Sequence, residues 1–230
     1  MKLSNRLEIH FLTLFPEILE PFLSASLVGK ARKKNLVSFH TTQIRDFATD
    51  VHHKVDDTPY GGGEGMVLKA DVLYRAWESV QDATTKTILL SPQGKILTQE
   101  KAKELSQEKK LILVCGHYEG VDERFTELSK AEEISVGDYV LTGGELPALL
   151  LADVLTRLLP GVVGNAKSLT EESLENHLLK YPQYTKPREF MGLSVPEVLL
   201  SGDHSTIGEW RDQQRKQRTR LKRPDLLKNG

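Results

Sequence analysis

Three glycine-containing segments each follow an apolar, strand-like run, and they are the part of the sequence best suited to hold a ligand. They are SPQG at 91–94, CGHYEG at 115–120 and SVGDYVLTGGELP at 135–147. In open parallel sheets, ligands bind beyond the carboxyl ends of the strands, where glycine lets the backbone approach closely. Loop amides and carbonyls can hydrogen-bond an adenine edge, and apolar neighbours such as Leu89, Val136 and Leu141 can sandwich its ring. The spacing therefore predicts one pocket lined by all three segments.

The signatures of several other ligand-binding and hydrolytic classes are missing. No G-x-G-x-x-G follows the first strand-like run, and the glycines of PYGGGEGM do not follow an apolar strand directly. The sequence also lacks a Walker lysine motif, G-x-S-x-G and H-E-x-x-H. These absences disfavour a dehydrogenase, a kinase, a serine hydrolase and a zinc protease.

The residues that would position these loops alternate between strand-like and helix-like patterns. Short β-branched or apolar runs separated by helical crossovers indicate an α/β fold with a parallel sheet and covering helices. The strands are expected at 7–14, 36–42, 87–90, 111–115 and 134–136. The helices are expected at 16–34, 69–80, 98–109, 122–128, 145–159 and 174–180, with further helical patterns up to residue 227. The apolar segment 145–159 is either a buried helix or a helix packed against another subunit.

Composition indicates a cytoplasmic protein with a charged end. The chain has 230 residues, one cysteine and a net charge of −1, which fits one good core plus a small appendage without disulfides. Residues 201–230 contain eight basic and four acidic residues, a net charge of +4, which leaves −5 for the rest. We therefore expect a polyanion to bind at one end. No signal peptide and no apolar stretch of about 18 residues is visible, so a soluble protein with no membrane contact is expected.

Several longer motifs resemble a known family, the bacterial tRNA (guanine-N1-)-methyltransferases called TrmD. The matching stretches, in chain order, are VDDTPYGGGEGM, LSPQGK, LILVCGHYEGVDER, SVGDYVLTGGELPALLLADVLTRLLPGV and YPQYTKP. The resemblance covers nearly the whole chain. It implies an S-adenosylmethionine-dependent enzyme that forms N1-methylguanosine at tRNA position 37, next to the anticodon.

The resemblance also implies an architecture that periodicity and composition could not show. It implies a SPOUT-like parallel sheet with a deep trefoil knot, followed by a small all-helical domain, in a homodimer with its active site at the subunit interface. Residues 1–163 would form the knotted catalytic domain, 164–176 a flexible linker and 177–230 a tRNA-binding domain.

Cofactor contacts are carried over from the family by position. The resemblance implies them for Leu90, Ser91, Pro92, Gly116, Tyr118, Glu119, Gly120, Val136, Gly137, Asp138, Tyr139, Val140, Leu141, Gly143 and Gly144. Glu119 could also help to place a magnesium ion, a further candidate cofactor, although a lone loop acid is more often simply solvated.

Two catalytic residues are implied by the same resemblance. Arg157 matches the family's catalytic arginine, whose charge would stabilise negative charge on guanine O6. Glu172 falls where the family usually has an aspartate as general base, so its carboxylate would remove the proton of guanine N1. Arg157 could instead be a helix-end cation, but a charge in so apolar a helix favours a functional role. Without the resemblance, Glu172 reads as a solvated linker acid or a first-turn residue of the next helix.

The basic C-terminal run would hold the RNA backbone. Phosphate contacts are expected from Arg211, Arg215, Arg218 and Arg220, although each could equally belong to a solvated helix face. Three rival functions stay open. They are a knotted methyltransferase acting on ribosomal RNA or another tRNA position, a non-catalytic RNA-binding or assembly protein, and a nicotinamide-dependent oxidoreductase.

Overall fold

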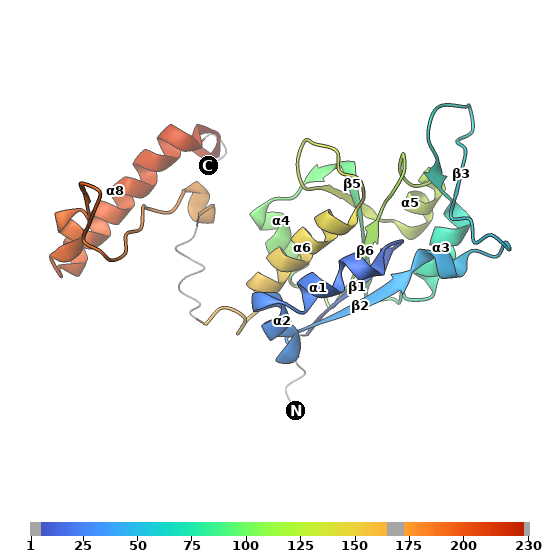
Figure 1. Cartoon of the computed structure of the whole chain (residues 1–230), viewed down its shortest axis with the longest axis horizontal. Coiled ribbons are helices and arrows are strands. Elements are labelled where there is room, and N and C mark those ends of the chain that lie inside the picture. The colour runs from blue at the N-terminus through green and yellow to red at the C-terminus, as the bar shows by residue number, and fades with distance from the viewer. Residues whose placement is uncertain (1–5, 165–172, 228–230) are drawn as a thin grey trace. The chain divides into compact units, whose positions relative to one another are not determined.

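The structure, a computed structural model, describes residues 6–164 and 173–227. The chain divides into two compact units, residues 1–164 and 165–230 (Figure 1). The first unit contains the sheet and all three glycine-containing segments. The described residues include no helix that is long and apolar enough to cross a membrane.

The first unit is built on a five-stranded sheet with the order β2-β1-β6-β5-β7, and every neighbouring pair is parallel. The strands are β1 (Leu7–Thr13), β2 (Val37–Gln43), β5 (Thr85–Ile96), β6 (Lys110–Cys115) and β7 (Glu132–Ser135). The expected α/β fold with a parallel sheet is confirmed. All strands therefore end at the same edge, which brings together the loops that follow them.

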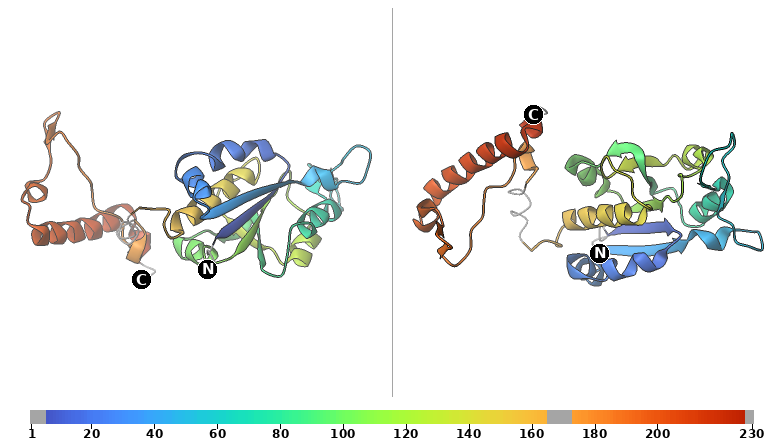
Figure 2. Two further views of the ribbon diagram at one scale, coloured as in Figure 1. Left: turned by 90° about the horizontal axis from the view of Figure 1, so that it is seen from below. Right: turned by 45° about the horizontal axis from the view of Figure 1, so that its top comes forward.

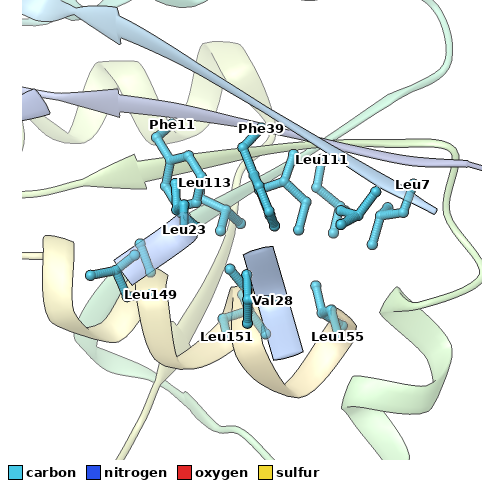
Figure 3. Packing of buried hydrophobic residues seen from close by; sticks show 14 of the residues in the cluster. Leu7, Phe11, Leu23, Val28, Phe39, Leu111, Leu113, Leu149, Leu151 and Leu155 are labelled. Carbon is cyan, nitrogen blue, oxygen red and sulfur yellow. The ribbon is translucent and has the colours of Figure 1, made fainter. Parts of the chain in front are cut away.

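Helices cover both faces of the sheet. One face packs against α1 (Glu20–Leu23), α2 (Ser26–Lys33), α4 (Gln99–Leu105) and α6 (Glu145–Leu158). The other face packs against α3 (Ala70–Glu78), α5 (Glu123–Ser129) and the 3-10 turn Ile44–Phe47. Figure 3 shows Leu149, Leu151 and Leu155 of α6 lying below Phe11, Phe39 and Leu113 of the strands. Two apolar layers therefore hold the sheet rigidly.

Local sequence explains where several elements begin and end. The carboxylate of Asp122 accepts the Arg124 backbone N–H at 3.0 Å, which confirms the expected N-cap of α5. The predicted helix at 16–34 is not continuous, because Ala25 has extended backbone angles and separates α1 from α2. Gly29 packs on the carbonyl of Ser24 at this break, where a Cβ would lie 2.1 Å from the oxygen.

The predicted loop at 91–94 is part of a longer strand. β5 is twelve residues long in total and continues through this segment. It pairs with β7 on both sides of a register shift between Leu90 and Lys95. Gly94 permits this close pairing, because a Cβ there would lie 2.4 Å from the backbone of Glu133. The extra residues at the shift form a bulge beside the pocket described below.

A smaller pair of antiparallel strands follows β2 and precedes α3 in the chain. It is formed by β3 (Asp56–Asp57) and β4 (Val67–Leu68). In Figures 1 and 2 the segment around this pair projects beyond the carboxyl ends of the strands. It contains the PYGGGEGM motif.

The second unit is organised around the 19-residue helix α8 (His204–Lys222), capped by Asp203. It also contains 3-10 turns at Glu175–His177, Glu197–Leu200 and Pro224–Leu227, and a hairpin of β8 (Glu189–Phe190) and β9 (Leu193–Ser194). The resemblance implied an all-helical domain, but the hairpin shows that this unit is not made of helices alone. The predicted helix at 174–180 is wrong, because only a single 3-10 turn forms and Asn176 has left-handed angles.

Candidate active site

One cavity of about 340 Å³ lies at the carboxyl ends of β6 and β7, beside the register shift in β5. Its walls come from all three glycine-containing segments, together with Leu89 and Leu90 in the middle of β5, Glu133 and Ile134 of β7, and Val121, Glu123 and Thr126 in and just before α5. The volume lies in the range of about 300–1,000 Å³ that small-molecule sites occupy. The expected convergence of the three segments is therefore confirmed.

Most of the predicted cofactor contacts lie in this wall. Fourteen of the fifteen line the cavity, namely Leu90, Ser91, Pro92, Gly116, Tyr118, Glu119, Gly120, Val136, Gly137, Tyr139, Val140, Leu141, Gly143 and Gly144. Asp138 is exposed and lies outside the lining. The Tyr139 N–H donates to the carbonyl of Gly137 at 2.9 Å, and this tight turn leaves Asp138 at its outer side. Which of these residues touch a cofactor stays a prediction.

Close backbone packing joins the second and third segments. The Gly144 N–H donates to the Gly116 carbonyl at 2.9 Å. A Cβ on Gly144 would lie 2.6 Å from the Cα of Cys115, so no other residue fits without moving the backbone. The third segment therefore lies directly on the end of β6.

The PYGGGEGM motif packs against the second segment. The Glu119 N–H donates to the Met66 carbonyl at 2.9 Å, and the Leu68 N–H donates to the Gly120 carbonyl at 3.0 Å. Gly65 has a φ of +84°, and a Cβ there would lie 2.5 Å from the Cγ of Glu119. The motif thus supports the loop that contains Glu119 from outside the cavity.

A buried polar group beside the cavity was not predicted from the sequence. Glu145, the first residue of α6, is 3% exposed. Its carboxylate accepts from the Thr13 hydroxyl at 2.5 Å and lies 2.7 Å from Nε2 of His117. His117 lines the cavity, and the Phe15 ring lies 4.9 Å from its ring. The sequence signal was weak, because these four residues come from three distant segments.

The same carboxylate affects the neighbouring cysteine. Burial, followed by the nearby charge of Glu145, holds the pKa of the Cys115 thiol well above its usual value. The thiol therefore stays protonated, which makes a nucleophilic role for Cys115 unfavourable.

Arg157 does not line the cavity of its own chain. It lies in the last turn of α6, ten residues after Pro147, which corresponds to about 15 Å along the helix. Positions 146, 150, 153 and 157 follow helical spacing, so Arg157 shares a stripe with the exposed Leu146 and Leu150. Glu172 lies outside the described residues.

The four predicted RNA-binding arginines all lie on α8 but do not form one face. At 100° per residue, Arg211, Arg215 and Arg218 lie on one stripe, while Arg220 points to the opposite side. Arg215 and Arg218 are half-buried, and the guanidinium of Arg211 lies 4.7 Å above the ring of Tyr181. Whether these arginines contact RNA phosphates stays a prediction.

No group of three or more His, Cys, Asp or Glu side chains in the described part of the chain is arranged to hold a metal ion. The magnesium role considered for Glu119 stays a prediction.

Comparisons with known proteins agree on one family. The model of the family described as tRNA (Guanine-1)-methyltransferase TrmD matches residues 7–229. A tRNA (guanine-N(1)-)-methyltransferase of Ruminiclostridium cellulolyticum is 53% identical over 219 residues, covering 94% of each chain. Proteins of the same name from Carboxydothermus hydrogenoformans and Bacillus subtilis are 50% and 49% identical. The alignments cover 96% and 97% of this chain and 88% and 93% of those relatives. The chain belongs to the TrmD family of tRNA (guanine-1)-methyltransferases.

Proposed function

We propose that this protein transfers a methyl group from S-adenosylmethionine to N1 of guanine 37 in tRNA. The observation that carries the proposal is the cavity formed by the three segments, in a chain that matches the TrmD family from residue 7 to 229. The curated relatives are named for methylation of tRNA at guanine N1. We also propose a cytoplasmic location, as the composition predicts.

The cavity suits an adenine-containing cofactor. Leu89, Ile134 and Leu141 supply apolar walls, and the glycine-rich segments expose backbone donors and acceptors. A Cβ added to Gly116 would meet only atoms of Leu89, Leu90 and Val121, at 3.8–4.0 Å. All three residues line the cavity, so the missing side chain of Gly116 leaves space inside it.

The trefoil knot is part of the proposal. Its support is the way in which three chain segments pack on one another at the carboxyl edge. The Leu97 N–H donates to the Ser135 carbonyl at 2.8 Å, and Gly94 packs on the backbone of Glu133. The chain then continues to Gly144, which packs on the end of β6. Knots are rare among protein folds, so the support is limited to this close packing of segments that are distant in the chain.

The chemistry assigned to the side chains is proton removal and charge stabilisation. S-adenosylmethionine, when bound, supplies an electrophilic methyl group. Guanine N1 carries a proton and is a poor nucleophile, so the carboxylate of Glu172 removes that proton. Negative charge then shifts toward O6, where the guanidinium of Arg157 stabilises it. Guanine 37 must leave the anticodon-loop stack to reach the pocket.

A homodimer is part of the proposal, and the position of Arg157 supports it. The arginine lies about 15 Å along α6 from the pocket of its own chain, so we propose that it serves the pocket of a second copy. The stripe of Leu146 and Leu150 is exposed in the single chain, as are Phe15, Ile18 and Phe22 near α1. Large exposed apolar groups of this kind typically mark protein interfaces.

The division of labour along the chain is proposed as follows. Residues 1–163 form the catalytic domain, 164–176 a linker, and 177–230 the tRNA-binding domain. The RNA-binding role of the last segment is supported by the basic character of α8, which contains Arg211, Arg215, Arg218 and Arg220. Arg211 is exposed and its guanidinium lies over the Tyr181 ring, so it remains accessible to a phosphate.

Methylation of tRNA transcripts that differ only at positions 36 and 37 tests the proposed function. We expect methyl transfer to transcripts with guanine at 37 and none when only that base is replaced. Mass spectrometry of the digested RNA gives the modified nucleotide. Equal transfer to all transcripts, or transfer to ribosomal RNA alone, would sink the proposal.

The role of Glu172 is tested by single-turnover methylation with two neighbouring variants. Glu172→Gln should slow transfer at least about 100-fold because the amide cannot take a proton. The matched control, Glu171→Gln, should stay within about threefold of the wild type. Equal rates for Glu172→Gln and the wild type would remove the general-base assignment.

Mixed subunits test whether Arg157 acts in the partner's pocket. Arg157→Ala removes the arginine, and Gly116→Leu fills the cavity; each variant alone should lose about 100-fold or more in activity. In a purified hybrid, the Arg157→Ala subunit supplies an intact pocket and the Gly116→Leu subunit supplies an intact Arg157. These two meet in one active site only if Arg157 acts across the interface. We expect the hybrid to regain about half of the wild-type rate. A hybrid as inactive as its parents would contradict the interface site.

A further inference from the structure

Glu145 is a buried carboxylate beside the cavity, and the proposed mechanism does not use it. It does not line the cavity, whereas its partner His117 does. A carboxylate that is 3% exposed is stable only when its oxygens are paired. Thr13 and His117 supply one partner for each oxygen. The position of Glu145 at the N-terminus of the 14-residue α6 adds the favourable end of the helix dipole.

The hydrogen bonds that reach Glu145 through Thr13 have a direction, and the direction of the His117 bond can be inferred from them. The Phe15 backbone N–H donates to the Thr13 hydroxyl at 2.9 Å, and that hydroxyl in turn donates to Oε1 of Glu145. The oxygen of Thr13 already accepts from Phe15, so its hydroxyl proton points to Glu145. This is the arrangement expected for an ionised carboxylate that accepts hydrogen bonds. Oε2 is then also an acceptor, so Nε2 of His117 carries the proton of this hydrogen bond. In a neutral imidazole ring, Nδ1 is left as the acceptor.

The His117 ring is also held from other directions. The Phe15 ring lies 4.9 Å from it. Gly143 lies so close that a Cβ there would be 2.2 Å from Cε1 of His117. His117 therefore sits between β1, the third segment and the start of α6, and it has little freedom to rotate. Its neighbours Gly116 and Tyr118 line the same cavity.

From this arrangement we infer that Glu145 is a positioning residue, which fixes the tautomer and orientation of His117 in the cofactor pocket and thereby sets the pocket's affinity for S-adenosylmethionine. The affinity part rests on the proposed function. The tautomer part does not, because it follows from the geometry of Thr13, His117 and Glu145 alone. The same contacts tie the pocket to Phe15, which is 37% exposed on the outer surface.

The Glu145→Gln variant retains the size of the side chain but changes its hydrogen bonding. A glutamine has one acceptor oxygen and one donor nitrogen, so it cannot accept from both Thr13 and His117. If the oxygen stays with Thr13, the amide nitrogen faces Nε2, and the proton of His117 moves to Nδ1. Nitrogen chemical shifts of the imidazole report this change directly. A merely structural role for Glu145 would not alter the tautomer.

The first arm of the test is NMR of imidazole nitrogens in the full chain. In the wild type we expect the His117 proton on Nε2, and in Glu145→Gln on Nδ1. A wild-type His117 protonated only on Nδ1 would overturn the inference without the need for any variant. This arm still decides the tautomer part of the inference if Glu145→Gln fails to fold. It also does so if the wild type does not bind S-adenosylmethionine, a result that would separately overturn the proposed function.

The second arm is a double-mutant cycle with calorimetric titration of S-adenosylmethionine. We expect Glu145→Gln to raise the Kd about tenfold or more, with kcat at saturating cofactor within about threefold of the wild type. In a His117→Ala background the same substitution should change the Kd less than about twofold, because Glu145 acts through His117. A full tenfold effect in that background would overturn the inference. The matched control Glu100→Gln, in the first turn of α4, should bind like the wild type.

Discussion

The packing of the Gly144 backbone on the end of β6 is the contact on which the rest of the structure depends. The Gly144 N–H donates to the Gly116 carbonyl, and no space is left for a Cβ against Cys115. α6 therefore begins directly at the sheet edge, and its buried face, including Leu151 and Leu155, closes the core below β1 and β6. The same contact brings the third glycine-containing segment against the second, which encloses the cavity between them.

The start of α6 also explains why a buried carboxylate is tolerated there. The helix N-terminus, the Thr13 hydroxyl and His117 compensate the cost of removing Glu145 from water. Farther along, α6 is apolar on two sides. One side lies in the core, whereas Leu146 and Leu150 remain exposed. Of the two interpretations that the sequence left open for this helix, burial is confirmed for one face. Packing of the exposed face against a second copy stays our proposal.

The sequence predicted the elements whose signals are local. Short β-branched or apolar runs located the five strands, although not the full length of β5, and an almost wholly apolar run located α6. Asp122 was correctly expected to cap α5. The convergence of the loops was also predictable, because parallel strands end at one edge. The family resemblance contributed the activity and the residues assigned to it, which no pattern of spacing would have indicated.

Features that depend on distant contacts were not predicted. Turn-like residues at 91–94 gave no hint that β5 continues, because its second half is stabilised by pairing with β7. The helical pattern at 174–180 was overridden at Asn176, whose left-handed angles end the turn. The Thr13–Glu145 hydrogen bond joins residues 132 positions apart, so only the fold brings them together. On α8, counting arginines predicted charge, but not that Arg220 points away from Arg211.

Calorimetric titration of the Gly144→Ala variant with S-adenosylmethionine tests the central claim that this backbone contact builds the cofactor pocket. The wild type should bind one S-adenosylmethionine per chain and no NAD. Gly144→Ala should weaken binding at least about 100-fold, since the added Cβ would lie 2.6 Å from the Cα of Cys115 and displace the segment. Gly164→Ala, where a Cβ meets nothing within 4 Å, should bind like the wild type. Wild-type affinity in the folded Gly144→Ala variant, or preference of the wild type for NAD, would contradict the account.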